Sequence, residues 1–222
     1  KVNWVGNYKY TDGRLDTLLD IDRGEVYDTE LLNQRLMQSR NGTDISSLYL
    51  DDGYLFFRVE PVEVAARGDT VDLEMRIHEG PQATYDDIII EGNDKTSDHV
   101  ILREIRTVPG DKFSRSEIIR SQREIVNLGF FNPQTIQVIP KPDPQSGTVD
   151  IKYIVEEKPS DQLFFQGGWG GAVRDPNTGE RLSNGLVGTV GLQFNNFSTR
   201  KLGDFKSWSP LPSGDGQKLG LQ

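Results

Sequence analysis

The sequence has 222 residues, of which 35% are hydrophobic and 27% are charged, and its net charge is −9 at pH 7. This length allows one large domain or two to three small ones. The excess of acidic residues falls on residues 1–158, which argues against nucleic acid as a partner because phosphate binding requires a basic face. The absence of cysteine excludes disulfide bonds, a thiolate nucleophile and a cysteine-ligated zinc site.

The start of the sequence and its apolar runs bear on membrane association. No run reaches the roughly 18 apolar residues of a membrane helix, so any membrane contact would have to be made by strands. The opening Lys1-Val2-Asn3-Trp4 lacks the apolar core of a signal peptide. We therefore expect the sequence to be a processed or excised piece of a longer protein.

Two segments of the sequence are copies of each other, with their landmarks in the same order. The paired landmarks are Gly6-Asn7 and Gly92-Asn93, Gly24 and Gly110, Gly53-Tyr54 and Gly129-Phe130, and Glu79-Gly80-Pro81 and Glu157-Lys158-Pro159. The offset between the copies shrinks along the chain, which places an insertion of about ten residues around Gln38 to Ser47. We therefore predict two repeats, residues 1–80 and 81–158.

Hydrophobic periodicity predicts the elements of the first copy. A helix is expected from about Thr11 to Asp20, because Leu15, Leu18 and Leu19 fall on one helical face. Alternation of apolar and polar residues over Val71 to Ile77 predicts a half-buried strand.

The second copy carries the same signals. A short helix is expected from about Ser97 to Arg106, and a longer one follows with Ile118, Ile119, Gln122, Ile125 and Val126 on one face. Ser114 and Glu117 have the spacing of a capping box at its start, and Gly129 is suited to end it. Alternation over Val149 to Val155 predicts the matching strand.

Each copy therefore follows the order strand, helix, helix, strand, strand. Two helices can cover one face of the three strands, and a helical crossover before a hairpin gives a mixed sheet. The third strand, Val71–Ile77 or Val149–Val155, contains no proline, so we expect it to lie in the centre of its sheet.

The ordered landmarks resemble the POTRA domain, the periplasmic repeat of outer-membrane insertases and polypeptide-transport porins. The resemblance covers residues 1–158, and its signature residues are Gly6, Asn7, Gly24, Gly53, Gly92, Asn93, Gly110 and Gly129. We interpret these residues as determinants of the fold and not as a chemical site. Lys158 departs from the pattern of the first copy, which has glycine there, and this indicates that no third repeat follows.

Residues 159–222 differ from the repeats. Leu163 to Gly171 is rich in aromatic residues and glycine, and Leu186 to Asn195 alternates apolar and polar residues except at Val187. Outer-membrane strands need about 9 to 11 residues with alternating faces. We therefore predict an α+β chain of two tandem POTRA-like β-α-α-β-β repeats followed by the first strands of an incomplete transmembrane β-barrel. A flexible glycine-rich tail is the alternative.

The sequence offers no constellation of catalytic residues. The two histidines, His78 and His99, fall in different repeats, the first on the polar face of a strand and the second in the first turn of a helix. We expect no catalytic, cofactor-binding or metal site, and therefore no enzyme and no cofactor.

The resemblance implies an outer-membrane insertase with its repeats in the periplasm. Its expected partners are unfolded outer-membrane β-barrel proteins, periplasmic accessory lipoproteins and, through the barrel, outer-membrane lipid. The alternatives are a polypeptide transporter pore of the two-partner-secretion type and, more remotely, a purely structural spacer.

Strand augmentation is the expected mechanism of client binding, because an extended client can pair with an exposed sheet edge. In family terms the strand after the second helix lies at that edge. The first copy has one proline there, Pro61, which leaves Phe56, Phe57, Arg58, Val59 and Glu60 as the candidate augmentation edge, with aromatic side chains beside it. The second copy carries Pro133, Pro140, Pro142 and Pro144, and each proline removes a donor. The alternative is that these prolines only prevent aggregation between edges.

Overall fold

The computed structural model describes residues 1–37, 42–208 and 211–221, with side chains for all of these except residues 169–174, 181–187 and 207. The chain divides into two compact units. The first unit comprises Lys1–Glu91, Ile105–Glu124 and Gln137–Ile154, and the second comprises Gly92–Glu104, Ile125–Ile136 and Val155–Gln222. The division runs through the second repeat, so the two units are described separately.

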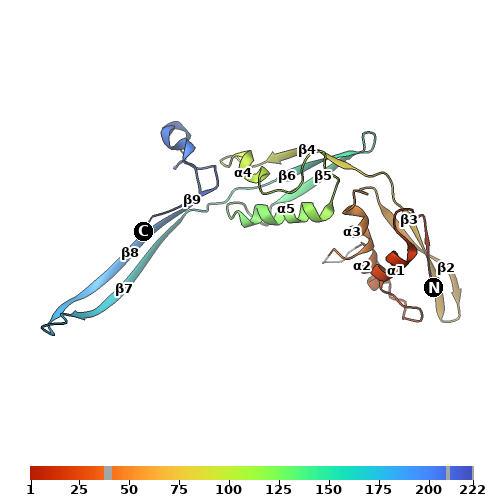
Figure 1. Ribbon diagram of the computed structural model, residues 1–222, viewed down its shortest axis with the longest axis horizontal. Helices are drawn as coiled ribbons and strands as arrows, with labels where there is room; N and C mark the ends of the chain where they lie inside the picture. The colour runs from red at the N-terminus through yellow and green to blue at the C-terminus, as the bar shows by residue number, and fades with distance from the viewer. Residues whose placement is uncertain (38–41, 209–210, 222) are drawn as a thin grey trace. The chain divides into compact units, whose positions relative to one another are not determined.

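The first repeat has a three-stranded mixed sheet (Figure 1). Its elements are β1 (Val2–Val5), α1 (Asp12–Leu19), α2 (Thr29–Met37), α3 (Ile45–Leu50), β2 (Arg58–Arg67) and β3 (Thr70–His78). The order of the strands is β1-β3-β2, with β1 parallel and β2 antiparallel to β3. The prediction that the third strand is central is confirmed.

The core of the first repeat joins the helices to one face of this sheet. The buried side chains of β3 are Leu73, Met75 and Ile77, which are the positions that alternation predicted. From the helices come Leu15 and Leu19 of α1, with Leu32, Leu36, Ile45 and Tyr49 of α2 and α3. The indole N–H of Trp4, which is also buried, donates to the Asp16 carboxylate at 2.7 Å, so its polar atom is satisfied at the edge of the core.

The predicted second helix of the first repeat is two helices, α2 and α3. The matching helix of the second repeat, α5 (Arg115–Asn127), is continuous over 13 residues. The insertion predicted at Gln38 to Ser47 falls between α2 and the first turn of α3, and its residues 38–41 lie outside the described part of the chain. Because α2 ends at Met37 and a separate helix begins at Ile45, the simple β-α-α-β-β order holds only for the second repeat.

The second repeat has the same strand arrangement. Its elements are β4 (Thr84–Glu91), α4 (Asp98–Leu102), α5, β5 (Gln137–Asp143) and β6 (Thr148–Ile154). In the first unit, the order of its strands is β4-β6-β5, with β4 parallel and β5 antiparallel to β6. The central position of β6 confirms the prediction, and Val149, Ile151 and Tyr153 are buried along it. The short helix α4 ends at Leu102, before the predicted end at Arg106.

The start of α5 has only half of the predicted capping box. The backbone N–H of Glu117 donates to Oγ of Ser114 at 3.3 Å, as expected of an N-cap. The backbone N–H of Ser114 donates to the hydroxyl of Tyr85 at 2.9 Å and not to the Glu117 side chain. Burial, and to a smaller extent the surrounding charges, raise the pKa of Tyr85 above its ordinary value of 10.0.

A glycine ends the first strand of each repeat in the same conformation. Gly6 and Gly92 both have φ of +89°, which residues with a Cβ rarely adopt. A Cβ on Gly6 would overlap the carbonyl oxygen of Ile77, and a Cβ on Gly92 would overlap that of Val155. Both positions therefore require glycine for its conformation and for the close approach of the two strands.

The asparagine after each glycine closes the turn into the next helix. Nδ2 of Asn7 donates to the carbonyl of Tyr10 at 3.0 Å and to the carboxylate of Asp12 at 2.7 Å. Nδ2 of Asn93 makes the equivalent hydrogen bonds, to the carbonyl of Thr96 and to the carboxylate of Asp98. The glutamate after the hairpin completes the turn, because Glu79 and Glu157 accept backbone N–H groups at equivalent positions. The two Gly-Asn pairs therefore shape the turn that follows the first strand of each repeat.

Within the first unit, an aspartate of the first repeat caps a helix of the second. The carboxylate of Asp51 accepts the backbone N–H of Ser116 at 2.7 Å and the hydroxyl of Ser114 at 3.0 Å, at the start of α5. A negative charge is stabilising at this end of a helix. The backbone continues the link, since the N–H of Phe113 donates to the carbonyl of Ala83 and the N–H of Ala83 donates to that of Gly53.

The next residue, Asp52, forms ion pairs with a lysine of each repeat. Its carboxylate lies 2.9 Å from Nζ of Lys9 and 3.2 Å from Nζ of Lys112. Both lysines lower the pKa of Asp52, chiefly through the hydrogen bond from Lys9 and then through Lys112. Asp51 and Asp52 together form a polar joint between the repeats.

In the second unit the tail forms a hairpin and a third strand, β7 (Gln162–Arg174), β8 (Arg181–Phe197) and β9 (Gln217–Leu221), in the order β7-β8-β9 (Figure 1). Two 3₁₀ turns, η1 (Arg200–Gly203) and η2 (Phe205–Ser207), precede β9. Within the described residues, no helix is long and apolar enough to cross a membrane.

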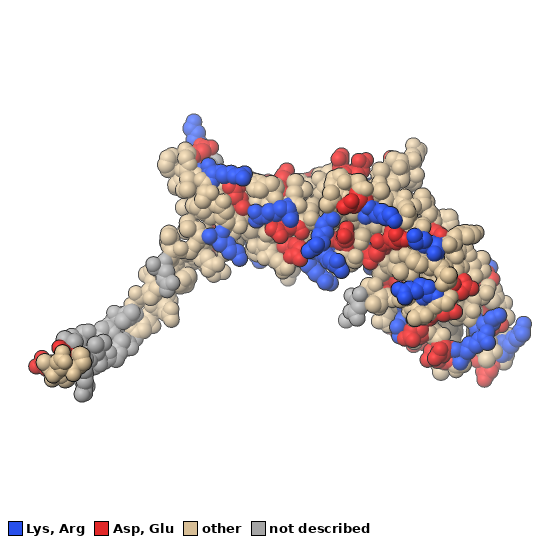
Figure 2. Space-filling view, viewed as in Figure 1, with Lys and Arg blue, Asp and Glu red and all other residues tan. Residues whose placement is uncertain are grey.

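The hairpin has one apolar face in the part whose side chains are described. The cross-strand pairs Leu163–Leu192 and Phe165–Val190 share this face, and all four side chains are exposed. The opposite face pairs Gln162 with Gln193, Phe164 with Gly191 and Gln166 with Thr189. On the side shown in Figure 2, charged side chains are interspersed over the repeats, whereas the described part of the hairpin between its base and its tip is tan. The predicted alternation is confirmed here, and the side chains of Leu186 and Val187 lie outside the described residues.

The second repeat contains a crowded glycine, Gly92, and an uncrowded one, Gly110, and comparing them tests the role of the close approach at Gly92. Gly92→Ala should lower the free energy of unfolding far more than Gly110→Ala, because both glycines have φ near +90° but a Cβ on Gly110 meets no atom within 4 Å. Gly110→Ala should then cost only the backbone strain, about 1–2 kcal/mol. Urea unfolding of the two variants measures the difference. Equal losses would contradict the role assigned to Gly92.

The joint at Asp52 predicts a titration. The carboxyl of Asp52 should titrate below its ordinary value of 3.8, and Lys9→Gln should raise its pKa more than Lys112→Gln. Because the pKa is lowered in the folded chain, the joint contributes stability at neutral pH that is lost as the pH falls below about 4. Carbon-13 NMR of the Asp52 carboxyl measures both effects. A pKa that does not change in the Lys112→Gln variant would show that this lysine does not pair with Asp52 in solution.

Candidate functional site

Each sheet of the first unit has two strands with an unpaired side. In the first repeat these edge strands are β1 and β2, and in the second they are β4 and β5, although Tyr85 at the start of β4 is hydrogen-bonded to Gly110 and Asp111. An unpaired strand side presents backbone donors and acceptors to any extended chain that approaches it. The edge of β2 spans 10 residues, against four in β1 and seven in β5. The strand predicted to be the augmentation edge is therefore the longest edge strand of the first repeat.

The structure corrects the position of the aromatic residues at this edge. The strand begins at Arg58, so Phe56 and Phe57 lie in the preceding turn. The ring of Phe57 is buried and stacks on that of Tyr49, with the ring centroids 4.2 Å apart. The expectation that its side chain stands beside the ladder is wrong, because the first repeat uses this ring to close its core. Of the other predicted residues, Val59 is also buried.

The charged residues of the predicted edge are exposed. Arg58 and Glu60 point away from the core and, together with Arg76, Ile77 and His78, line a shallow cleft of about 270 Å³ on the open face of the sheet. Arg76 forms an ion pair with Glu74 at 2.8 Å. An incoming strand at β2 would therefore meet polar side chains on this face.

The prolines distinguish the two edges. In β2 there is one, Pro61, whereas β5 contains both Pro140 and Pro142. Residues two apart in a strand direct their N–H groups to the same side, and proline within a sheet faces the unpaired side of an edge strand. Pro140 and Pro142 have no N–H group, so within β5 only the N–H of Val138 is left as a donor on the unpaired side. On β2, Val59 and Glu63 keep outward donors on either side of Pro61.

The histidines do not form a site together. His78 lies on the open face of the first sheet, as predicted, and its side chain is exposed. His99 belongs to the second unit, where its Nε2 lies 3.8 Å from the Asp215 carboxylate. Among the described residues, no group of three or more histidine and acidic side chains is arranged to hold a metal ion.

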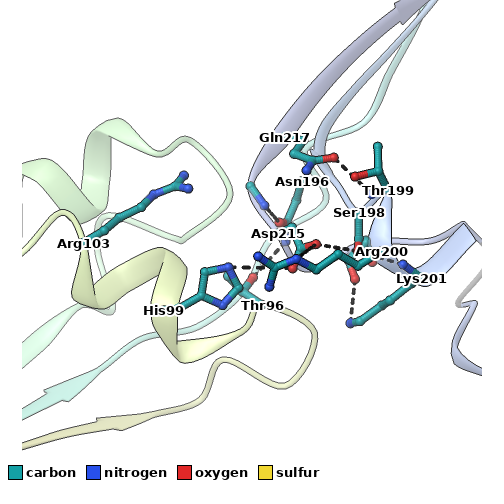
Figure 3. A network of polar contacts seen from close by, with 12 residues as sticks. Thr96, His99, Arg103, Asn196, Ser198, Thr199, Arg200, Lys201, Asp215 and Gln217 are labelled. Carbon is teal, nitrogen blue, oxygen red and sulfur yellow. Dashed lines mark hydrogen bonds and ion pairs between the residues drawn. The ribbon is translucent and has the colours of Figure 1, made fainter.

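In the second unit, the tail is joined to the start of α4 through Asn196, the second-last residue of β8 (Figure 3). Its Nδ2 donates to Oγ1 of Thr96 at 2.8 Å, and its Oδ1 accepts the backbone N–H of Gly216 at 2.8 Å. The backbone follows the same path, because the N–H of Ser97 donates to the carbonyl of Gly214 and the N–H of Gly214 donates to that of Asn196. One asparagine therefore connects the second repeat, the end of β8 and the start of β9.

A buried carboxylate supports this connection. Asp215 is 7% exposed and accepts the hydroxyl of Ser198 at 2.8 Å. His99 and Arg200 approach it from two sides, with nitrogens 3.8 Å and 4.0 Å away. Figure 3 shows these side chains converging on Asp215 from α4 and from the residues after β8. The cluster connects Ser198 and Asp215 of the tail with His99 of α4.

The sequence did not predict the residues of the joint between the repeats, Asp51 and Asp52, or those that connect the tail to α4, Asn196 and Asp215. Asp52 stands before Gly53 where the second copy has Leu128 before Gly129, so a polar residue replaces an apolar one at a shared landmark. That difference between the copies was a usable signal. The alternating segment predicted in the tail stops at Asn195, and no sequence pattern marks Asn196 or Asp215.

A family model described as "POTRA: Surface antigen variable number repeat" matches residues 1–80 and 83–158. Among similar sequences, the outer membrane protein assembly factor BamA of Nitratidesulfovibrio vulgaris is 26% identical over 186 residues, covering 80% of this chain and 23% of that protein. BamA of Neisseria meningitidis serogroup B is 28% identical over 221 residues, covering 93% of this chain and 26% of that protein. The chain thus spans about a quarter of the length of these relatives.

Solved structures share the fold. The crystal structure of BamA from Haemophilus ducreyi lacking POTRA domains 1–3 covers 100% of this chain and 35% of that one, with a TM-score of 0.69 and 21% sequence identity. The BamA POTRA3–5 structure from Haemophilus influenzae covers 72% of this chain and 65% of that one, with a TM-score of 0.53 and 17% identity. Because the family model matches both repeats, this chain belongs to the POTRA family.

Proposed function

We propose that this chain is the periplasmic and first membrane portion of an outer-membrane protein assembly factor. In this proposal the repeats lie in the periplasm and bind unfolded β-barrel proteins by strand augmentation, and the tail begins the barrel that helps to insert them. The observation that carries the proposal is the order of parts in one chain, two POTRA repeats followed directly by a hairpin with an exposed apolar face.

The edge of β2 supports the binding step. Backbone pairing requires donors and acceptors in register but no particular side chain, so it suits a protein with many clients. The outward donors of Val59 and Glu63, the exposed Arg58 and Glu60, and the length of β2 favour this edge over β5. The repeats supply binding and orientation only, so the proposed function requires no catalytic residue.

The hairpin supports the membrane step. Exposed apolar pairs lie on one face, and the other face carries polar residues and glycine together with Phe164, which is close to the alternation of outer-membrane strands. Gly191 leaves room for the ring of Phe164, since a Cβ there would overlap this ring. The names of the relatives favour assembly over the secretion pore considered as an alternative. Periplasmic lipoproteins are the proposed accessory partners.

Arg58 and Gln137 are matched positions for a crosslinking test, because each is exposed and is the first residue of its edge strand. A photoreactive amino acid at position 58 should capture an extended peptide from an outer-membrane β-barrel protein more efficiently than one at position 137. The yield measures how often each edge is paired. Equal or reversed yields would contradict the assignment of β2 as the client edge.

Replacing the prolines of β5 tests whether they prevent client pairing at this edge or only prevent aggregation between edges. The double variant Pro140→Thr and Pro142→Thr restores two donors on exposed positions, so the crosslinking yield at Gln137 should rise towards that at Arg58. Sedimentation checks that the variant stays monomeric. An unchanged yield with new self-association would mean that these prolines only prevent aggregation.

A further inference from the structure

Two 3₁₀ turns after β8 expose large apolar side chains. Leu202 of η1 is 46% exposed and Phe205 of η2 is 74% exposed. Trp208 lies behind Phe205, with ring centroids 4.9 Å apart, and its indole N–H donates to the carbonyl of Lys201 at 2.9 Å. Leu202 and Phe205 therefore form an exposed apolar surface, in which Phe205 packs against a half-buried tryptophan, and the contact of such a surface with water is unfavourable.

This surface is held in place from the other side of the loop. Nζ of Lys201 donates to the carbonyl of Ser213 at 2.7 Å, and the hydroxyl of Ser198 donates to the buried Asp215. The same loop is hydrogen-bonded to the start of α4 through Gly214 and Asn196 (Figure 3). Because these contacts fix its backbone, the exposure of Phe205 is a property of the folded loop.

Basic residues flank the two apolar residues in the sequence. Residues 198–208 contain three bases and one acid, in a chain whose net charge is −9. The side chain of Arg200 is 77% exposed and Lys206 is exposed. Apolar and aromatic side chains flanked by basic ones are typical of a segment that lies in the interface of a membrane and contacts anionic headgroups.

The position of the loop agrees with this chemistry. It begins at Ser198, directly after the last residue of β8, and the apolar face of β8 includes Val190 and Leu192. If these side chains contact acyl chains, as the proposed function requires, a loop that starts six residues after Leu192 lies near the headgroup region.

We propose that Leu202, Phe205, Arg200 and Lys206 form a lipid-docking surface for anionic phospholipid headgroups on the periplasmic side of the outer membrane. This inference rests on the proposed function. The apolar pair enters the headgroup boundary, the two cations pair with phosphates, and Trp208 supports the pair from behind. Because the same loop is bound to α4, docking would also set the position of the end of the second repeat at the membrane surface.

Fluorescence quenching tests the surface in the intact protein, prepared without other cysteines and reconstituted in vesicles of phosphatidylethanolamine and phosphatidylglycerol. Single Phe205→Cys, Leu163→Cys and Val26→Cys variants carry an environment-sensitive fluorophore, and some lipids carry a nitroxide on the headgroup or on the acyl chain. Leu163 reports on the hairpin face, and Val26, which is 89% exposed in the first repeat, reports on water.

The label at position 205 should shift to shorter wavelength and lose fluorescence most strongly to headgroup nitroxides, whereas the label at position 26 should do neither. Adding Arg200→Gln and Lys206→Gln, or replacing phosphatidylglycerol by phosphatidylcholine, should weaken the quenching at position 205. If position 163 is quenched and position 205 behaves like position 26, the docking surface is refuted while the proposed function stands. If position 163 is also unquenched, both are refuted.

Discussion

Backbone N–H and C=O groups need partners, and a sheet of three strands leaves two strands with one side unpaired. Both repeats pair the central strand on its two sides, with a parallel neighbour on one side and an antiparallel one on the other. The glycine after β1 or β4 permits a close approach to the end of the central strand, at Ile77 within β3 and at Val155 just after β6. What remains open is the outer side of the edge strands, and the repeats differ in how they treat it. β5 loses two donors to proline, whereas β2 loses one.

The repeats and the tail are connected by polar contacts of single side chains. Asp51 caps α5 and Asp52 pairs with Lys112 in the first unit, while Asn196 and Asp215 bind the tail loop to α4 in the second. Buried or half-buried hydrogen bonds have directional geometry, so they specify orientation better than an apolar contact of similar area. An edge strand is useful to a client only if it is held at a defined place, and these joints provide that placement within each unit.

Much of the fold was predictable because the chain repeats itself. Alternation over Val71–Ile77 and the ordered glycines predicted the central strand and the turns, since both depend on local sequence. The division of the helix into α2 and α3 was not predicted, because periodicity does not show where an insertion breaks a helical ladder. The burial of Phe57 was missed for another reason. Its partner Tyr49 is eight residues away on α3, and the strand starts one residue after Phe57, so alternation does not determine its direction.

Hydrogen exchange at the backbone of β2 tests the central claim, that this edge pairs with an extended client. Adding a peptide from an outer-membrane β-barrel protein should slow the exchange of the outward N–H groups of Val59 and Glu63, as followed by NMR. Val138, the remaining outward donor of β5, should exchange at its original rate. Unchanged exchange at Val59 and Glu63 with the peptide bound, or equal protection at Val138, would contradict the account.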